Sequence, residues 1–183
     1  AASRHRSWRQ CVELVTGVAD GLAAAHAAGV LHRDIKPGNI LIGANGYAKL
    51  ADFGLAKLVD SGAQDAARAT AGRTTRAGVV VGTVAYMSPE QTTGQPLDAR
   101  SDVFSFGIVL YELLAGRRPF ESANDLGVLK SIAHEDPAPL PDTVPELLRM
   151  AVDKALEKEP ADRYQTMQDF VADLRRVTRK SAS

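Results

Sequence analysis

The sequence predicts a mainly α-helical domain that contains one short β-hairpin. Apolar residues recur at three- and four-residue spacing near both ends of the chain, as on one face of an amphipathic helix. The segment 101–115 is apolar on nearly every side, which is typical of a helix that is buried all round. Between them, the pair Asn45-Gly46 separates two short apolar runs and is a strong signal for a tight hairpin turn.

The composition is that of an ordinary globular domain. The chain has 183 residues, of which 45% are hydrophobic and 24% charged, and we expect one domain with one core. The 22 basic side chains balance the 22 acidic ones, which argues against a general nucleic-acid or membrane-surface binder. The sequence has no apolar run of about 18 residues, so we expect no membrane segment in this chain.

The cysteine content favours a reducing compartment. Cys11 is the single cysteine and cannot form an internal disulfide, so a cytoplasmic location is expected. A longer parent chain could still be anchored to a membrane elsewhere. Cys11 falls on the apolar face of the first predicted helix, where a buried and unreactive thiol is expected.

The first predicted helix begins at a capping box. Ser7 and Gln10 have the spacing of that motif, and Gly29 is expected to end the helix. Between these limits apolar residues recur at helical spacing: Cys11, Leu14, Val15, Val18, Leu22 and Ala25. His26 lies within the helix and is expected to be a packed or partly exposed structural residue, because no second ligand stands at metal-binding spacing.

Further helices are expected in the second half of the chain. The buried helix 101–115 should end at Gly116. The sequence then predicts helices over 122–133, over 143–156 and from Thr166 onward. The second of these is placed by the pattern Thr143-x-x-Glu146, which resembles a capping box. Residues 180–183 are expected to be frayed.

The segment 32–39 combines side chains that are suited to chemistry. The carboxylate of Asp34, the ammonium of Lys36 and the amide of Asn39 can converge only if the loop is tightly folded, and the Pro-Gly pair between them favours such folding. The hairpin that follows should place Asn39 and Asp52 at matching ends of neighbouring strands. The alternative is an ordinary polar surface loop.

The segments His32-Arg33-Asp34-Ile35-Lys36-Pro37-Gly38-Asn39 and Asp52-Phe53-Gly54 resemble the catalytic and metal-binding loops of eukaryotic-type serine/threonine protein kinases, in the Hanks-type form common in bacteria. The resemblance covers residues 1–183 but only the carboxy-terminal lobe of such a kinase. The expected fold is therefore the mainly α large lobe with its short β-hairpin. The small β-rich lobe, with its Gly-x-Gly-x-x-Gly loop, is absent.

The resemblance implies a role for each residue of the two loops. Asp34 would orient the acceptor hydroxyl and take its proton, while Lys36 would meet the charge on the transferred phosphoryl group. Asn39 and Asp52 would bind Mg²⁺, or Mn²⁺, together with ATP. Leu41 would form the floor of the adenine pocket, although a plain core leucine is an equally good interpretation. The expected reaction transfers the γ-phosphoryl group of ATP to a Ser or Thr hydroxyl of a protein substrate.

Residues 52–90 would form the activation segment. Asp60 to Gly78 contains almost no large apolar residues and is expected to be mobile. The cations Arg33 and Lys57 would lie close together, and a phosphothreonine between them would relieve their repulsion. The candidate phosphorylation sites are Thr70, Thr74 and Thr75. An unmodified flexible linker is the alternative.

The end of this segment is similar to the same kinase region. Thr83 is expected to bridge Asp34 and Lys36 by hydrogen bonds. Ser88 stands where the family usually has Ala, a difference expected to matter little. Glu90 would be buried and would need a partner, for which Arg163 stands at the matching family position.

The resemblance also implies structural roles for several other residues. Asp102, near the start of the buried helix, would cap that helix and accept hydrogen bonds from the backbone of the catalytic loop. His32 and Phe53 are structural by the same resemblance. Leu31, Leu41 and Phe53 would lose the surface that a small lobe normally supplies and would form an exposed apolar patch.

The expected partners are a protein substrate and an amino-terminal lobe. Without that lobe the isolated chain is expected to bind ATP weakly and to be inactive. A non-catalytic binding or scaffold module that keeps idle catalytic residues is one alternative. An inert product of gene truncation is another.

Overall fold

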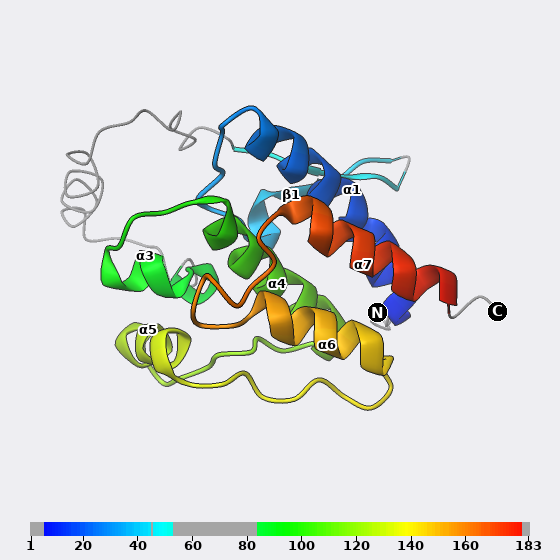
Figure 1. Ribbon diagram of the computed structural model, residues 1–183. Coiled ribbons are helices and arrows are strands. Elements are labelled where there is room, and N and C mark those ends of the chain that lie inside the picture. Colours follow the sequence, from blue (N-terminus) through cyan, green and yellow to red (C-terminus); the bar gives the residue numbers. More distant parts are fainter. Residues whose placement is uncertain (1–5, 45, 53–83, 181–183) are drawn as a thin grey trace.

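The computed structural model describes residues 6–44, 46–52 and 84–180 (Figure 1). This part of the chain is mainly helical with one two-stranded sheet, as the sequence predicts. The helices are α1 (Trp8–Ala27), α3 (Pro89–Thr93), α4 (Ala99–Ala115), α5 (Asp125–His134), α6 (Glu146–Ala155) and α7 (Met167–Lys180). The strands are β1 (Ile40–Ile42) and β2 (Ala48–Leu50), and short 3-10 helices are η1 (Pro37–Asn39) and η3 (Val84–Tyr86).

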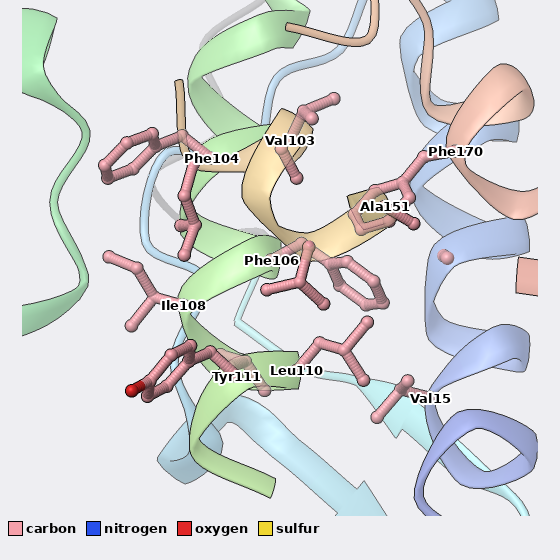
Figure 2. Close-up of a cluster of buried hydrophobic side chains, with 14 of the residues drawn as sticks. Val15, Val103, Phe104, Phe106, Ile108, Leu110, Tyr111, Ala151 and Phe170 are labelled. Atoms are coloured by element: carbon pink, nitrogen blue, oxygen red, sulfur yellow. The ribbon is translucent and has the colours of Figure 1, made fainter. Parts of the chain in front are cut away.

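Helix α4 forms the centre of the core. Every residue from 101 to 111 is buried, which confirms the prediction of a helix covered on all sides. Figure 2 shows its side chains pointing to both sides of the helix, and Phe106 makes an edge-on contact with Phe170 of α7 at a centroid distance of 5.7 Å. Gly107 allows α6 to approach closely, because a Cβ atom there would lie 3.1 Å from Ala155 Cβ.

The capping residue of α4 is Asp98, and the prediction that Asp102 caps it is wrong. The helix begins at Ala99, two residues before the predicted start, because the Asp98 side chain accepts a hydrogen bond from the Arg100 N–H at 2.8 Å. Asp102 therefore lies inside the first turn. Gly116 ends the helix in the left-handed conformation, with φ 69°, as predicted.

Helix α1 has the predicted capping box. The Gln10 N–H donates to Ser7 Oγ at 3.3 Å and the Ser7 N–H donates to Gln10 Oε1 at 2.9 Å. Gly29 follows the helix with φ 74°. Cys11 is buried as predicted, and this burial raises the pKa of its thiol.

The predicted start of the helix at Ser122 is wrong. Helix α5 begins at Asp125, because Asn124 Oδ1 accepts a hydrogen bond from the Gly127 N–H at 2.8 Å and caps the helix there.

The predicted capping box at Thr143 is also wrong. Helix α6 begins at Glu146, and Val144 instead closes a turn through its N–H to Pro141 O at 2.9 Å. Pro145 explains the difference, because a residue that precedes proline is disfavoured from helical geometry. Helix α7 begins at Met167, where Thr166 Oγ1 accepts from the Asp169 N–H at 3.1 Å.

The hairpin prediction is confirmed. Strands β1 and β2 are antiparallel, and Leu41 lies opposite Lys49. Gly46 has φ 80°, and the Gly43 N–H donates to Tyr47 O at 2.9 Å across the turn. The hairpin exposes apolar side chains, because 59% of Leu41, 50% of Ile42 and 71% of Tyr47 is accessible to solvent.

Helices α1 and α7 lie side by side (Figure 1). Arg9 donates to Thr178 O at 3.0 Å, and Arg175 forms an ion pair with Asp20 at 2.6 Å. The first and last helices thus pack against each other. Across residues 6–44, 46–52 and 84–180, no helix has both the length and the apolar character needed to cross a membrane.

Candidate active site

The loop between α1 and β1 brings Asp34, Lys36 and Asn39 together. Lys36 Nζ lies 2.8 Å from Asp34 Oδ2. Asn39 Nδ2 donates to Asp34 O at 2.8 Å and to Asp34 Oδ2 at 3.2 Å. The single turn of η1 makes this possible, since the Asn39 N–H bonds back to Lys36 O at 3.0 Å. The Pro-Gly pair thus folds the loop as tightly as the sequence predicts.

The hydrogen bonds leave one oxygen available on Asp34 and one on Asn39. Asp34 O can only accept, so the Asn39 atom at 2.8 Å from it must be the amide nitrogen, and Oδ1 is the atom left over. None of the described residues donates to Asn39 Oδ1 or to Asp34 Oδ1. Both oxygens therefore keep the capacity to bind a ligand.

Asp52 directly follows Ala51, the residue whose backbone pairs with that of Asn39. The Ala51 N–H donates to Asn39 O at 2.7 Å, which extends the hairpin ladder by one pair beyond Ile40 and Leu50. Asp52 comes directly afterwards and turns the chain with φ 63°. Asn39 and Asp52 thus lie at the same end of the hairpin, and their side chains carry hard oxygen ligands of the kind that fits Mg²⁺.

Asp102 holds the backbone that precedes Asp34. Its Oδ2 accepts from the His32 N–H at 2.8 Å and its Oδ1 from the Arg33 N–H at 2.9 Å. Arg33 has the left-handed backbone with φ 67°, which is unusual for a residue other than glycine. His26 Nε2 also lies 2.8 Å from Asp102 Oδ2, a contact that the sequence reasoning missed. One signal for this contact was available in the sequence. His26 lies four residues after Leu22 and therefore on the same face of the helix, which is the face that is buried.

His32 connects this loop to the end of β2. Its side chain is buried; Nδ1 accepts from the Asp34 N–H at 3.3 Å and Nε2 lies 3.1 Å from Ala51 O. Because a carbonyl oxygen can only accept, these contacts place the ring proton on Nε2. His32 therefore ties Asp34 to the residue that precedes Asp52.

Glu90 and Arg163 form a buried ion pair. Arg163 is 2% and Glu90 5% exposed, and both carboxylate oxygens accept from the guanidinium at 2.8 Å. Burial by itself raises the pKa of Glu90, but hydrogen bonds from Arg163 and from Ser101 outweigh it and hold that pKa below its usual range. The pair anchors α3 to the loop before α7.

Ser88 stands where the family usually has Ala, and its structural role is larger than the sequence predicts. It is fully buried, and its Oγ accepts from the Gln91 N–H at 3.3 Å as the first residue of a second capping box. Gln91 also donates through Nε2 to Arg33 O at 2.8 Å. Sequence reasoning missed Gln91, although Ser88-x-x-Gln91 repeats the pattern of Ser7-x-x-Gln10.

Leu41 lies on β1 and is exposed, so its interpretation as a core residue is wrong. Leu31 is only 4% exposed, so the expectation that it joins an exposed patch is also wrong. The remaining predicted site residues lie outside the described residues: Phe53, Lys57, Thr70, Thr74, Thr75 and Thr83.

Comparison with known proteins adds a further finding. A family model described as the protein kinase domain matches residues 2–173. The probable serine/threonine-protein kinase PknB of Corynebacterium glutamicum is 38% identical over an alignment of 181 residues, which covers 95% of this chain and 27% of that protein. The serine/threonine-protein kinase PknA of Mycobacterium tuberculosis is 41% identical over 160 residues, which are 87% of this chain and 35% of that protein.

The serine/threonine-protein kinase PknB of Mycolicibacterium smegmatis is 41% identical over an alignment of 174 residues, which covers 92% of this chain and 26% of that protein. The chain thus spans only 26% to 35% of the length of these relatives.

Proposed function

Because the chain belongs to the protein kinase family, in its bacterial Hanks-type form, we propose that it is the catalytic lobe of a serine/threonine protein kinase. In this proposal it transfers the γ-phosphoryl group of ATP to a Ser or Thr hydroxyl of a protein substrate. It acts in the cytoplasm, together with an amino-terminal lobe outside the 183 residues. The observation that supports the proposal best is the convergence of Asp34, Lys36 and Asn39 beside Asp52.

The proposed roles follow from the hydrogen bonds of Asp34. Lys36 and Asn39 both bond to Oδ2 and so fix the direction of the carboxylate. Oδ1 then accepts the proton of the substrate hydroxyl and orients that oxygen toward the phosphoryl group. Lys36, which is partly exposed beside Asp34, neutralises charge that develops on the transferred group.

Asn39 Oδ1 and the Asp52 carboxylate are the proposed ligands of Mg²⁺. Their oxygens also suit Mn²⁺. The ion would neutralise charge on the phosphates of ATP. Phosphate oxygens and water would be the remaining ligands of the ion. The Nδ2 hydrogen bonds of Asn39 turn Oδ1 away from Asp34, which keeps the two roles on separate atoms. Leu41, exposed on β1, forms the floor under the adenine ring in this proposal.

Arg33 is proposed to receive a phosphorylated activation segment. Its Nε is buried, and no described residue accepts a hydrogen bond from that atom. A phosphate on Thr70, Thr74 or Thr75, paired with Arg33 and Lys57, would be such an acceptor. Mapping of phosphorylated residues in the purified active protein should find a modified residue between Asp60 and Thr83. Its absence there would remove this part of the proposal.

Thr83 is proposed to bridge Asp34 and Lys36.

The catalytic proposal is tested by Asp34→Asn in the full-length protein that contains this lobe with its amino-terminal partner. Loss of the proton acceptor should reduce phosphoryl transfer from ATP to a protein substrate by about a hundredfold or more. The same substitution at Asp142, whose side chain is 96% exposed, is the matched control and should leave the rate unchanged.

An Asp34→Asn protein with the wild-type rate would exclude Asp34 as the proton acceptor. A wild-type protein that binds a fluorescent ATP analogue in the presence of Mg²⁺, but transfers no phosphate, would favour a binding or scaffold module. A coding sequence that supplies no lobe before Ala1 would favour an inert fragment.

A further inference from the structure

Gln91 connects the start of α3 to the loop that contains Asp34. Its Oε1 accepts from the Ser88 N–H at 2.9 Å, which completes the capping box of α3. Its Nε2 donates to Arg33 O at 2.8 Å. One end of the amide group therefore bonds within the start of α3, and the other end bonds to a residue 58 positions earlier in the sequence.

The carbonyl that Gln91 holds belongs to the peptide group between Arg33 and Asp34. Arg33 has φ 67°, a conformation that surrounding contacts must maintain in a residue other than glycine. The Arg33 N–H bonds to Asp102 Oδ1 at 2.9 Å, and the Asp34 N–H bonds to His32 Nδ1 at 3.3 Å. Gln91 supplies the hydrogen bond on the carbonyl side, so both polar atoms of this peptide group have partners.

We infer that Gln91 is a positioning residue for Asp34. Rotation about the Arg33 Cα–C bond would move the Asp34 Cα and change the direction of its carboxylate. The hydrogen bond from Gln91 Nε2 opposes that rotation. The inference rests on the proposed phosphoryl transfer and adds a residue that directly follows the 52–90 segment to the support of its proton acceptor. The competing explanation is that Gln91 serves only as the cap of α3.

Substitutions at Gln91 separate these explanations. In Gln91→Glu the carboxylate can still accept from the Ser88 N–H but cannot donate to Arg33 O. In Gln91→Met both hydrogen bonds are lost and no charge is introduced. The chain offers a matched control in Gln10, which caps α1 with the same distances of 2.9 and 3.3 Å and, among the hydrogen bonds of the described residues, makes none to Arg33. Gln10→Glu and Gln10→Met therefore report the effect of the cap alone.

The experiment measures kcat, the KM for ATP and amide hydrogen exchange of residues 32–36 in the full-length protein. Both Gln91 variants should lower kcat by about fivefold or more, as expected for one lost hydrogen bond, while the KM for ATP stays within about twofold. The Arg33 and Asp34 amides should exchange faster in both variants. The Gln10 variants should match the wild type in kcat and in exchange of residues 32–36.

If Gln91→Glu retains the wild-type kcat and exchange, and only Gln91→Met is impaired, Gln91 is a helix cap and the inference is wrong. If the wild-type protein transfers no phosphate, the proposed function fails on its own. The exchange rates of Arg33 and Asp34 then still decide the inference, because faster exchange in both Gln91 variants supports it and unchanged exchange overturns it.

Discussion

Replacement of Arg163 by methionine should strongly destabilise the protein. Its guanidinium is fully buried and bonds to both carboxylate oxygens of Glu90 at 2.8 Å. It also donates to backbone carbonyl oxygens: Glu157 O at 2.7 Å, Lys158 O at 2.6 Å and Arg100 O at 3.1 Å. The Arg163→Met variant would leave the Glu90 carboxylate buried with Ser101 Oγ as its remaining side-chain donor.

The expected cost follows from the burial of the pair. Removal of one partner of a buried ion pair lowers the free energy of unfolding by about 3–5 kcal/mol, because a buried charge is left without compensation. In a chain of this length each kcal/mol lowers Tm by about 2–4 °C, so Tm should fall by about 6–20 °C. The difference from the wild type should shrink as the pH falls. The hydrogen bonds of Arg163 hold the pKa of Glu90 low, and their stabilisation is lost once Glu90 is protonated.

Thermal unfolding followed by circular dichroism at pH 7 measures this effect. Arg149→Met is the matched control, because Arg149 pairs with exposed Asp142 and should cost about 1 kcal/mol or less. The double variant Glu90→Gln/Arg163→Met should cost less than the sum of its single substitutions, since the two residues interact directly. A Tm within about 2 °C of that of Arg149→Met, or strict additivity in the double variant, would refute this reasoning.

Two further predictions concern the interior. Burial lowers the pKa of Lys158 to about 8, whereas an unfolded lysine titrates near 10.4. Between these pH values the unfolded chain binds more protons, so the free energy of unfolding should rise from pH 8 to pH 10, by at most about 2 kcal/mol. Denaturant unfolding at both pH values measures the rise, and Lys158→Met should abolish it; a rise of equal size in that variant would contradict the assignment. Gly107→Ala should lower the free energy of unfolding by about 1 kcal/mol or more, because the added Cβ would press on Ala155 in α6. The control is Gly21→Ala in α1, where no atom lies within 4 Å of the added Cβ. This substitution should be neutral or should raise the free energy of unfolding by up to about 1 kcal/mol. Equal effects at both positions would show that α4 and α6 are not tightly packed.

Helix limits could be predicted where one local signal dominates. Ser7, Gln10 and Gly29 fix α1 because the capping groups and the helix are neighbours in sequence. At Thr143 two local signals conflict: the capping-box pattern favours a helix start, while Pro145 disfavours helical geometry at Val144. The proline effect determines the structure, and α6 starts at Glu146.

The contacts of the candidate site could likewise be predicted from local patterns only where the residues are close in sequence. Asp34, Lys36 and Asn39 lie within six residues, so their convergence follows from the fold of a single loop. The Glu90–Arg163 pair spans 73 residues, and only the family resemblance predicted this pair from the sequence. The His26–Asp102 contact spans 76 residues and no local pattern encodes it. Such contacts depend on how the helices pack, which the spacing of apolar residues does not determine.

The contact of α1 with α7 bears on how the chain folds during synthesis. Helix α7 leaves the ribosome after every other helix described here, yet its apolar residues Phe170, Leu174 and Val177 are buried in the same core as Val15 and Leu22 of α1. Part of α1 therefore stays uncovered until α7 has been synthesised. The nascent chain must keep that surface from aggregating until α7 packs against it.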